Sequence, residues 1–119
     1  GDGYDNFFLG LGAPYSGSVT NMIAIILIGN SCGFRTCSDG SCSTEWVSVP
    51  DYWAKWREFT IEWRTDNVVF YAEEFTRTIE TNIPSGPLYP MMNVLTPTTV
   101  KPTDAGEIHV KSLKTRRLI

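Results

Sequence analysis

The sequence is poor in the residues that most catalytic and metal sites need. It has one histidine, His109, and three cysteines among 119 residues. Catalysis by a Ser/His/Asp or Cys/His set requires partner residues that this sequence does not identify. No glycine loop of the phosphate-binding kind leads into a helix. The apolar run Met22 to Ile28 has seven residues, far short of the roughly 18 that a membrane span requires, and its β-branched residues indicate a buried strand.

The bulk composition indicates one soluble globular domain over residues 1–119. Hydrophobic residues make up 42% of the chain and charged residues 19%, which is ordinary for such a domain. The net charge of -3 is mild, but residues 1–51 are acidic on balance and residues 101–119 basic. The basic end would suit an acidic surface or nucleic acid, yet we prefer a solvated last strand and tail and expect no nucleic-acid partner. The chain begins without Met or a signal sequence, so we expect a processed or excised product.

The three cysteines are spaced five residues apart, at Cys32, Cys37 and Cys42. Asp39 and Gly40 lie between the last two, so Cys37 to Cys42 reads as a tight hairpin that a disulfide would close. A disulfide indicates an oxidising compartment, and we expect a secreted or extracellular protein. Cys32 is then buried and free, or bonded to another chain. A zinc site is disfavoured, because the spacing is not CxxC and His109 is distant in sequence.

Alternating apolar residues between Lys55 and Pro87 predict a β-meander. Phe59, Ile61 and Trp63 alternate with polar residues, a period of two that places one face in a core. Residues 64–67 form a polar turn, and residues 68–72 alternate in the same way. Two hairpin registers fit, with the loop at residues 65–66 or 66–67. We prefer the second, because the first places Glu58 opposite Glu73.

The rest of the chain predicts further strands and no helix. Both faces of residues 21–29 are apolar, which predicts a strand in the middle of a sheet. Pro90, within the strand predicted at residues 88–95, indicates an edge position or a bulge. Further strands are expected at residues 7–11, 45–49, 76–81 and 107–115, with a cysteine-bearing hairpin at 32–43. Eight or nine such strands predict an all-β sandwich or barrel.

Several segments together resemble the C-terminal half of the concanavalin A-like jelly rolls. They are FTIEW (59–63), VVFYA (68–72), RTIETNI (77–83) and PSGPLYPMMNVL (84–95), closed by the strand at 107–114. This superfamily includes the family 16 glycoside hydrolases and the laminin G-like and lectin-like modules. The resemblance implies an antiparallel β-sandwich with one concave sheet that often holds a glycan.

The sequence departs from this superfamily in two ways. Glu73-Glu74-Phe75 stands where the family carries Asp-Gly, and single-domain sandwiches run to roughly 200–250 residues. The jelly roll is therefore truncated, or another polypeptide supplies its first strands. A missing strand would leave an open sheet edge that invites pairing with a partner.

The catalytic acids of family 16 are absent from the corresponding stretch. Those enzymes carry Glu-x-Asp-x-Glu on one strand, whereas residues 5–9 contain only Asp5 as an acid. Glu58 and Glu62 share a strand face, but four residues at about 3.3 Å each place them too far apart for a retaining or inverting pair. We therefore expect no catalytic residues. Asp2 and Asp5, in GDGYDN, would suit calcium, but no EF-hand ligand spacing accompanies them.

Aromatic residues give a softer indication, of a binding surface. Rigid aromatic side chains cover contact area at little entropic cost, and four of them occur within residues 46–56. We expect Trp46 and Trp56 to fill the core. Tyr52 and Trp53 fall in a loop, and together with Asn93, a lone amide in an apolar strand, they are our predicted ligand-binding residues.

The leading prediction is a non-catalytic extracellular module that binds carbohydrate or another cell-surface ligand. The first alternative is a structural or assembly subunit of an extracellular filament, envelope or shell, joined through the open sheet edge or the unpaired cysteine. The second alternative is a fragment of a family 16-like glycoside hydrolase whose acids lie upstream of Gly1. No cofactor is expected beyond the calcium considered above.

Overall fold

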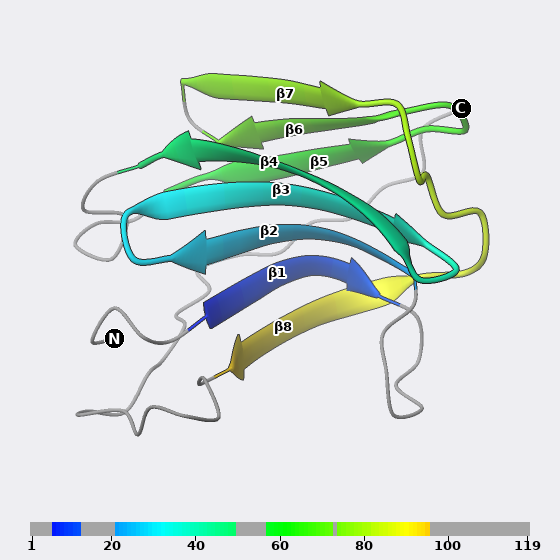
Figure 1. The fold of residues 1–119 in the computed structure, drawn as a ribbon, viewed down its shortest axis with the longest axis horizontal. Coiled ribbons are helices and arrows are strands. Elements are labelled where there is room, and N and C mark those ends of the chain that lie inside the picture. The colour runs from blue at the N-terminus through cyan, green and yellow to red at the C-terminus, as the bar shows by residue number, and fades with distance from the viewer. Residues whose placement is uncertain (1–5, 13–20, 50–56, 73, 96–119) are drawn as a thin grey trace.

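The computed structural model describes residues 6–12, 21–49, 57–72 and 74–95 of the chain. These residues form eight β-strands and no helix, arranged in two antiparallel sheets (Figure 1). The strands are β1 (Asn6–Gly12), β2 (Met22–Ile28), β3 (Ser31–Ser38), β4 (Ser41–Ser48), β5 (Phe59–Trp63), β6 (Val68–Ala72), β7 (Phe75–Ile79) and β8 (Tyr89–Leu95). The prediction of an antiparallel all-β fold is confirmed. No helix in the described ranges is long and apolar enough to cross a membrane.

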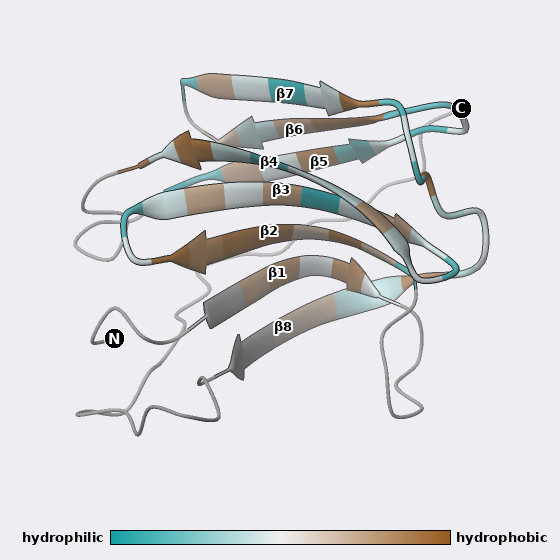
Figure 2. Cartoon of the chain, in the orientation of Figure 1, coloured by the Kyte–Doolittle hydropathy of each residue, from teal (hydrophilic) through white to brown (hydrophobic). Residues whose placement is uncertain are grey.

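The larger sheet has five strands in the order β4-β3-β2-β1-β8. β2 is at its centre, as its apolar faces predicted, and Figure 2 shows it apolar along most of its length. Every residue from Met22 to Leu27 is buried, so both faces of this strand are covered. Among the described strands β8 has a partner on one side only, which agrees with the edge position that was one of the two interpretations of Pro90.

The smaller sheet has the order β5-β6-β7 and is the predicted meander. Its register pairs Trp63 with Val68 and Phe59 with Ala72, which is the register with the loop at residues 65–66. Our preference for the other register was wrong. The described pairing ends at Phe59 and Ala72, so Glu58 lies outside the ladder and is exposed to solvent, which removes the reason for that preference.

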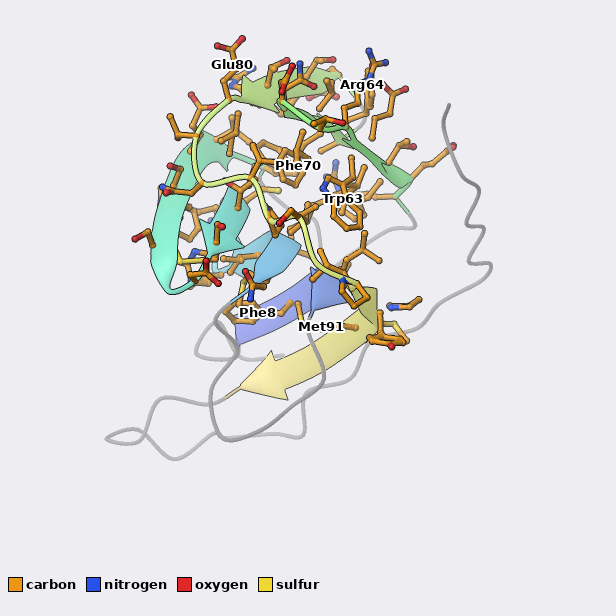
Figure 3. The ribbon with its side chains drawn as sticks, turned by 90° about the vertical axis from the view of Figure 1, so that its right-hand side faces the viewer. Phe8, Trp63, Arg64, Phe70, Glu80 and Met91 are labelled. Atoms are coloured by element: carbon orange, nitrogen blue, oxygen red, sulfur yellow. A yellow bond between two sulfur atoms is a disulfide. The ribbon has the colours of Figure 1, made fainter. Side chains whose placement is uncertain are left out.

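The main core fills the space between the two sheets. It joins Ile23, Ile25 and Leu27 of β2 to Phe70 of β6, and the rings of Phe34 and Phe70 lie 5.3 Å apart. Phe70 and Trp63 lie in this space, whereas Arg64 and Glu80 lie at the periphery (Figure 3). The Trp63 indole nitrogen donates to the carbonyl oxygen of Pro84 at 3.1 Å. Residues with period-two alternation on both sheets therefore supply one shared apolar layer.

The segment between β7 and β8 crosses from the small sheet to the large one and is tied to β3 and β4. The Thr36 hydroxyl donates to the Thr81 carbonyl oxygen at 2.8 Å, and the Asn82 amide donates to the Ser43 hydroxyl at 2.8 Å. The hydroxyls of Ser43 and Thr81 also share a hydrogen bond. These contacts join the two sheets along the side where β4 and β7 are edge strands.

β3 and β4 form one long hairpin around Asp39-Gly40. Asp39 and Gly40 have φ angles of 51° and 87°, and two consecutive positive φ values suit the twist of a two-residue hairpin. Cys37 and Cys42 are directly paired across the hairpin and form a disulfide, with their Cα atoms 4.1 Å apart. The predicted disulfide is confirmed. The separate strand expected at residues 45–49 is instead the second half of β4.

Two predicted features lie outside the described residues. They are the last strand, at residues 107–115, and the loop that contains Tyr52 and Trp53. The third strand of the meander was predicted at residues 76–81 and is found at Phe75–Ile79.

Candidate functional site

The candidate site is on the face of the five-stranded sheet that is turned away from the three-stranded sheet, which we call the outer face. Alternate residues of β2 define it: Ile23, Ile25 and Leu27 belong to the core between the sheets, so Met22, Ala24 and Ile26 point the other way. The cross-strand register then assigns positions on the neighbouring strands to the same face. They are Asn6, Phe8, Gly10 and Gly12 on β1, Ser31, Gly33, Arg35 and Cys37 on β3, Cys42, Thr44, Trp46 and Ser48 on β4, and Tyr89, Met91, Asn93 and Leu95 on β8.

The centre of the outer face is covered and its β4 side is open. Ala24 and Ile26 are at most 1% exposed, and Phe8 and Met91 pack against them. Figure 3 shows Phe8 and Met91 on β1 and β8, away from Phe70 and Trp63. Two large side chains of this face are exposed: Trp46 on β4 and Tyr89, 54% exposed, on β8 at the other end of the described sheet. Only Trp46 has a charged residue of this face on the strand beside it, so the candidate site is placed along β3 and β4.

Trp46 is the most prominent open group on that side, with 48% of its surface exposed. It is paired with Gly33 of β3, and a Cβ atom on Gly33 would lie only 2.8–3.0 Å from three carbon atoms of the indole ring. The ring therefore lies directly against the β3 backbone, in space that only a glycine leaves free. The six-membered ring of the indole packs against the sheet, and about half of the Trp46 surface faces solvent as an apolar platform.

The prediction that Trp46 fills the core was wrong. Within β4, Cys42, Thr44, Trp46 and Ser48 share one side of the strand, and Val47 on the other side is buried in the core. The polar neighbours of Trp46 at alternate positions were a signal of exposure that the sequence already contained. Clustering of aromatic residues in sequence obscured it, because proximity along the chain does not report which face of a strand a residue occupies.

Arg35 and Thr44 lie beside this platform and are held together. The Arg35 Nε atom donates to the Thr44 hydroxyl oxygen at 2.9 Å, and Arg35 is half-buried. Arg35 is paired with Thr44, two residues before Trp46, so Arg35 and Trp46 are diagonal neighbours. Such neighbours are about 7 to 8 Å apart, within reach of long side chains. An aromatic surface and a cationic hydrogen-bond donor thus adjoin on one face.

The structure tests the predicted ligand-binding residues only in part. Tyr52 and Trp53 lie outside the described residues, as does Trp56. Asn93 is paired with Phe8, at the end of the row that continues through Ile26 and Gly33 to Trp46. Four steps of about 4.8 Å between strands separate the two ends of this row by roughly 19 Å. The fold therefore does not bring Asn93 and Trp46 together at one sugar ring.

The three cysteines do not form a metal site. Cys37 and Cys42 are consumed by the disulfide, and Cys32 is free and fully buried in the core. Burial raises the pKa of Cys32 to about 12, against an opposing effect of Arg57, so the thiol stays protonated at neutral pH. No group of three or more metal-ligating side chains occurs within residues 6–12, 21–49, 57–72 and 74–95. The calcium candidates Asp2 and Asp5 lie outside these ranges.

Carboxylates are also absent from the described part of the outer face. No position that the register assigns to this face carries Asp or Glu. On the other sheet, Glu62 pairs with Arg64 at 2.9 Å. The described outer face can thus stack, hydrogen-bond and attract an anion, but it presents no acid pair of the kind that hydrolyses glycosides.

Comparison with known proteins identifies no relative of this chain. No protein-family model, no curated protein and no solved structure matches the chain.

Proposed function

We propose that this protein is a non-catalytic extracellular module that binds carbohydrate, with a concanavalin A-like jelly-roll fold. The observation that carries the proposal is the half-exposed indole of Trp46, packed closely against Gly33 on the outer face of a five-stranded sheet. A sugar ring has an apolar face edged by hydroxyls. It is complemented by a rigid aromatic ring with polar groups beside it, which here are Arg35 and Thr44.

Two further features support the proposal. The disulfide between Cys37 and Cys42 is typical of proteins outside the reducing cytosol. Two stacked antiparallel sheets, with an apolar central strand and a proline-bearing edge strand, suit the jelly-roll assignment. Cys32 does not suit the alternative of thiol-linked assembly, because a fully buried thiol is not accessible to a second chain.

A glycan array tests the proposal with three proteins. The wild-type chain is expected to bind a defined set of glycans. The variant Trp46→Ala is expected to bind about tenfold or more weakly, because it loses the large apolar contact made by the indole. The control is Met92→Ala on β8, whose side chain is 54% exposed and so comparable with Trp46. Met92 lies on the opposite face of the sheet, so its removal is expected to leave glycan binding unchanged. Equal binding by all three proteins, or no glycan binding by the wild type, would contradict the proposal.

A further inference from the structure

We propose that Arg35 makes the open side of the outer face selective for glycans that carry uronic acids. In this arrangement the carboxylate of the sugar pairs with the Arg35 guanidinium, while a sugar ring stacks on Trp46. The inference rests on the proposed carbohydrate-binding function and adds the chemical class of the ligand.

The first observation is the charge balance of the outer face. Arg35 is the only charged residue at its described positions, on β1, β2, β3, β4 and β8. The described part of the chain supplies no carboxylate partner to Arg35, whose one side-chain hydrogen bond goes to the Thr44 hydroxyl. Among the described residues no acid of this face neutralises Arg35, so its charge remains available to attract an anion.

The second observation is the contrast with two other arginines. Arg64 is exposed and already paired with Glu62 at 2.9 Å. Arg77 donates to the Thr76 carbonyl oxygen, and its guanidinium lies 5.8 Å from the centre of the Phe75 ring. Both side chains have partners that suit a structural role. Arg35 is held at its Nε atom by a neutral hydroxyl, which orients the group without neutralising its charge.

The third observation is the geometry of the group that stays available. An arginine side chain has five N–H donors, and only the Nε donor is used by Thr44. The donors on the two terminal nitrogens form a planar fork, which matches a planar carboxylate through two parallel hydrogen bonds. A uronic acid carries that carboxylate directly on the sugar ring. One residue of such a glycan spans the short diagonal from Arg35 to Trp46, about 7 to 8 Å.

The test compares acidic oligosaccharides with their neutral counterparts. Calorimetry at low salt measures the affinity of the protein for oligogalacturonate, oligomannuronate and hyaluronan oligosaccharides. Each oligosaccharide is compared with its own derivative in which the carboxyl groups are reduced to alcohols. The wild-type protein is expected to bind at least one acid about tenfold or more tightly than its reduced form, because charge-assisted hydrogen bonds are lost on reduction. The preference is expected to weaken as salt increases.

Variants assign this preference to Arg35. Arg35→Gln is expected to abolish the difference between acid and reduced forms, and Arg35→Lys to retain part of it, since lysine keeps the charge but lacks the fork. The matched control is Arg64→Gln, which removes the same charge from the other sheet and is expected to leave the preference unchanged. Thermal unfolding of each variant verifies that it is folded.

Each contrary outcome overturns a specific statement. Binding of neutral glycans with equal or greater affinity, still dependent on Trp46, would overturn the uronic acid assignment and leave the carbohydrate-binding function in place. Stronger binding of a sulfated galactan, which is anionic but contains no uronic acid, or of polyglutamate, would overturn it as well. Failure to bind any glycan, acidic or neutral, would overturn both proposals.

Discussion

The hydroxyl of Thr36 donates a hydrogen bond to the carbonyl oxygen of Thr81, 45 residues later in the chain, at 2.8 Å. Thr36 is fully buried, although it is polar. It lies in β3 of the large sheet, and Thr81 lies in the crossing that follows the small sheet. One side-chain hydroxyl therefore helps to fix how the two sheets meet.

Thr36→Val is expected to lower the free energy of unfolding by about 1 kcal/mol, the usual net value of one hydrogen bond. Valine has nearly the same shape, so the loss reports the hydroxyl and not a cavity. Urea unfolding measures the change. Thr36→Ser keeps the hydroxyl and serves as the control, although it loses a methyl group. A valine variant as stable as the wild type would show that the bond to Thr81 contributes nothing.

Gly33→Ala is expected to destabilise the protein only when Trp46 is present. The added Cβ atom would lie 2.8 Å from the indole and force the ring to move. With Trp46→Ala in the background this conflict disappears, and alanine in place of glycine within a strand should then be neutral or stabilise by about 0.5–1 kcal/mol. A four-protein cycle in urea measures the coupling between the two positions. Equal effects of Gly33→Ala in both backgrounds would contradict the observed contact.

Removal of the disulfide by Cys37→Ser with Cys42→Ser is expected to cost about 2 kcal/mol of unfolding free energy. This value follows from closing a loop of about six residues in the unfolded chain. The disulfide also lies near the exposed hairpin tip, so the variant is expected to keep its fold. Circular dichroism and urea unfolding verify both statements, and loss of the β-sheet spectrum would show that the disulfide is required for folding.

Cys32 is expected to be unreactive and to make stability fall at high pH. Its pKa is about 12 in the folded protein, against 9.0 for an unperturbed cysteine thiol, so the unfolded chain loses this proton first as pH rises. The contribution of Cys32 to the free energy of unfolding is therefore fully present below pH 9. It declines between pH 9 and 12, by at most about 1.4 kcal/mol per pH unit.

Two measurements test the expectation for Cys32. A thiol reagent should label the protein only in denaturant, because the side chain is 0% exposed in the folded state. Above pH 9 the urea midpoint should fall less steeply with pH for Cys32→Ala than for the wild type. The two proteins share all their tyrosines and lysines, so the difference between their profiles reports Cys32 alone. Rapid labelling of the native protein, or identical pH profiles, would show that the thiol is accessible or does not titrate as described.

Local sequence patterns predicted most of the strands because alternation follows from backbone geometry. Phe59, Ile61 and Trp63 face one way in any β-strand, whatever the rest of the fold does. Likewise, Asp39-Gly40 favours a tight turn by its own conformational preferences. The turn brings Cys37 opposite Cys42, so that disulfide was predictable without tertiary information.

The register of the β5–β6 hairpin was not predictable in this way. Both candidate registers kept the same residues on the core face, so hydrophobic alternation could not separate them. The repulsion between Glu58 and Glu73 was given too much weight, because the ladder ends before those positions. Where a strand stops depends on the packing around it, which short-range rules do not report.

The sequence by itself determined the approximate positions of most described strands, the apolar central strand and the disulfide, since each follows from a few adjacent residues. The tertiary structure decided which residues of different strands come to lie beside one another on each face. Trp46 packs against β3 because β3 offers a glycine beside it, and among the described residues Arg35 has no acidic partner because of the residues that neighbouring strands place on the outer face. Those relations join residues that are distant in sequence, and a face of a sheet acquires its chemistry only after the strands are assembled.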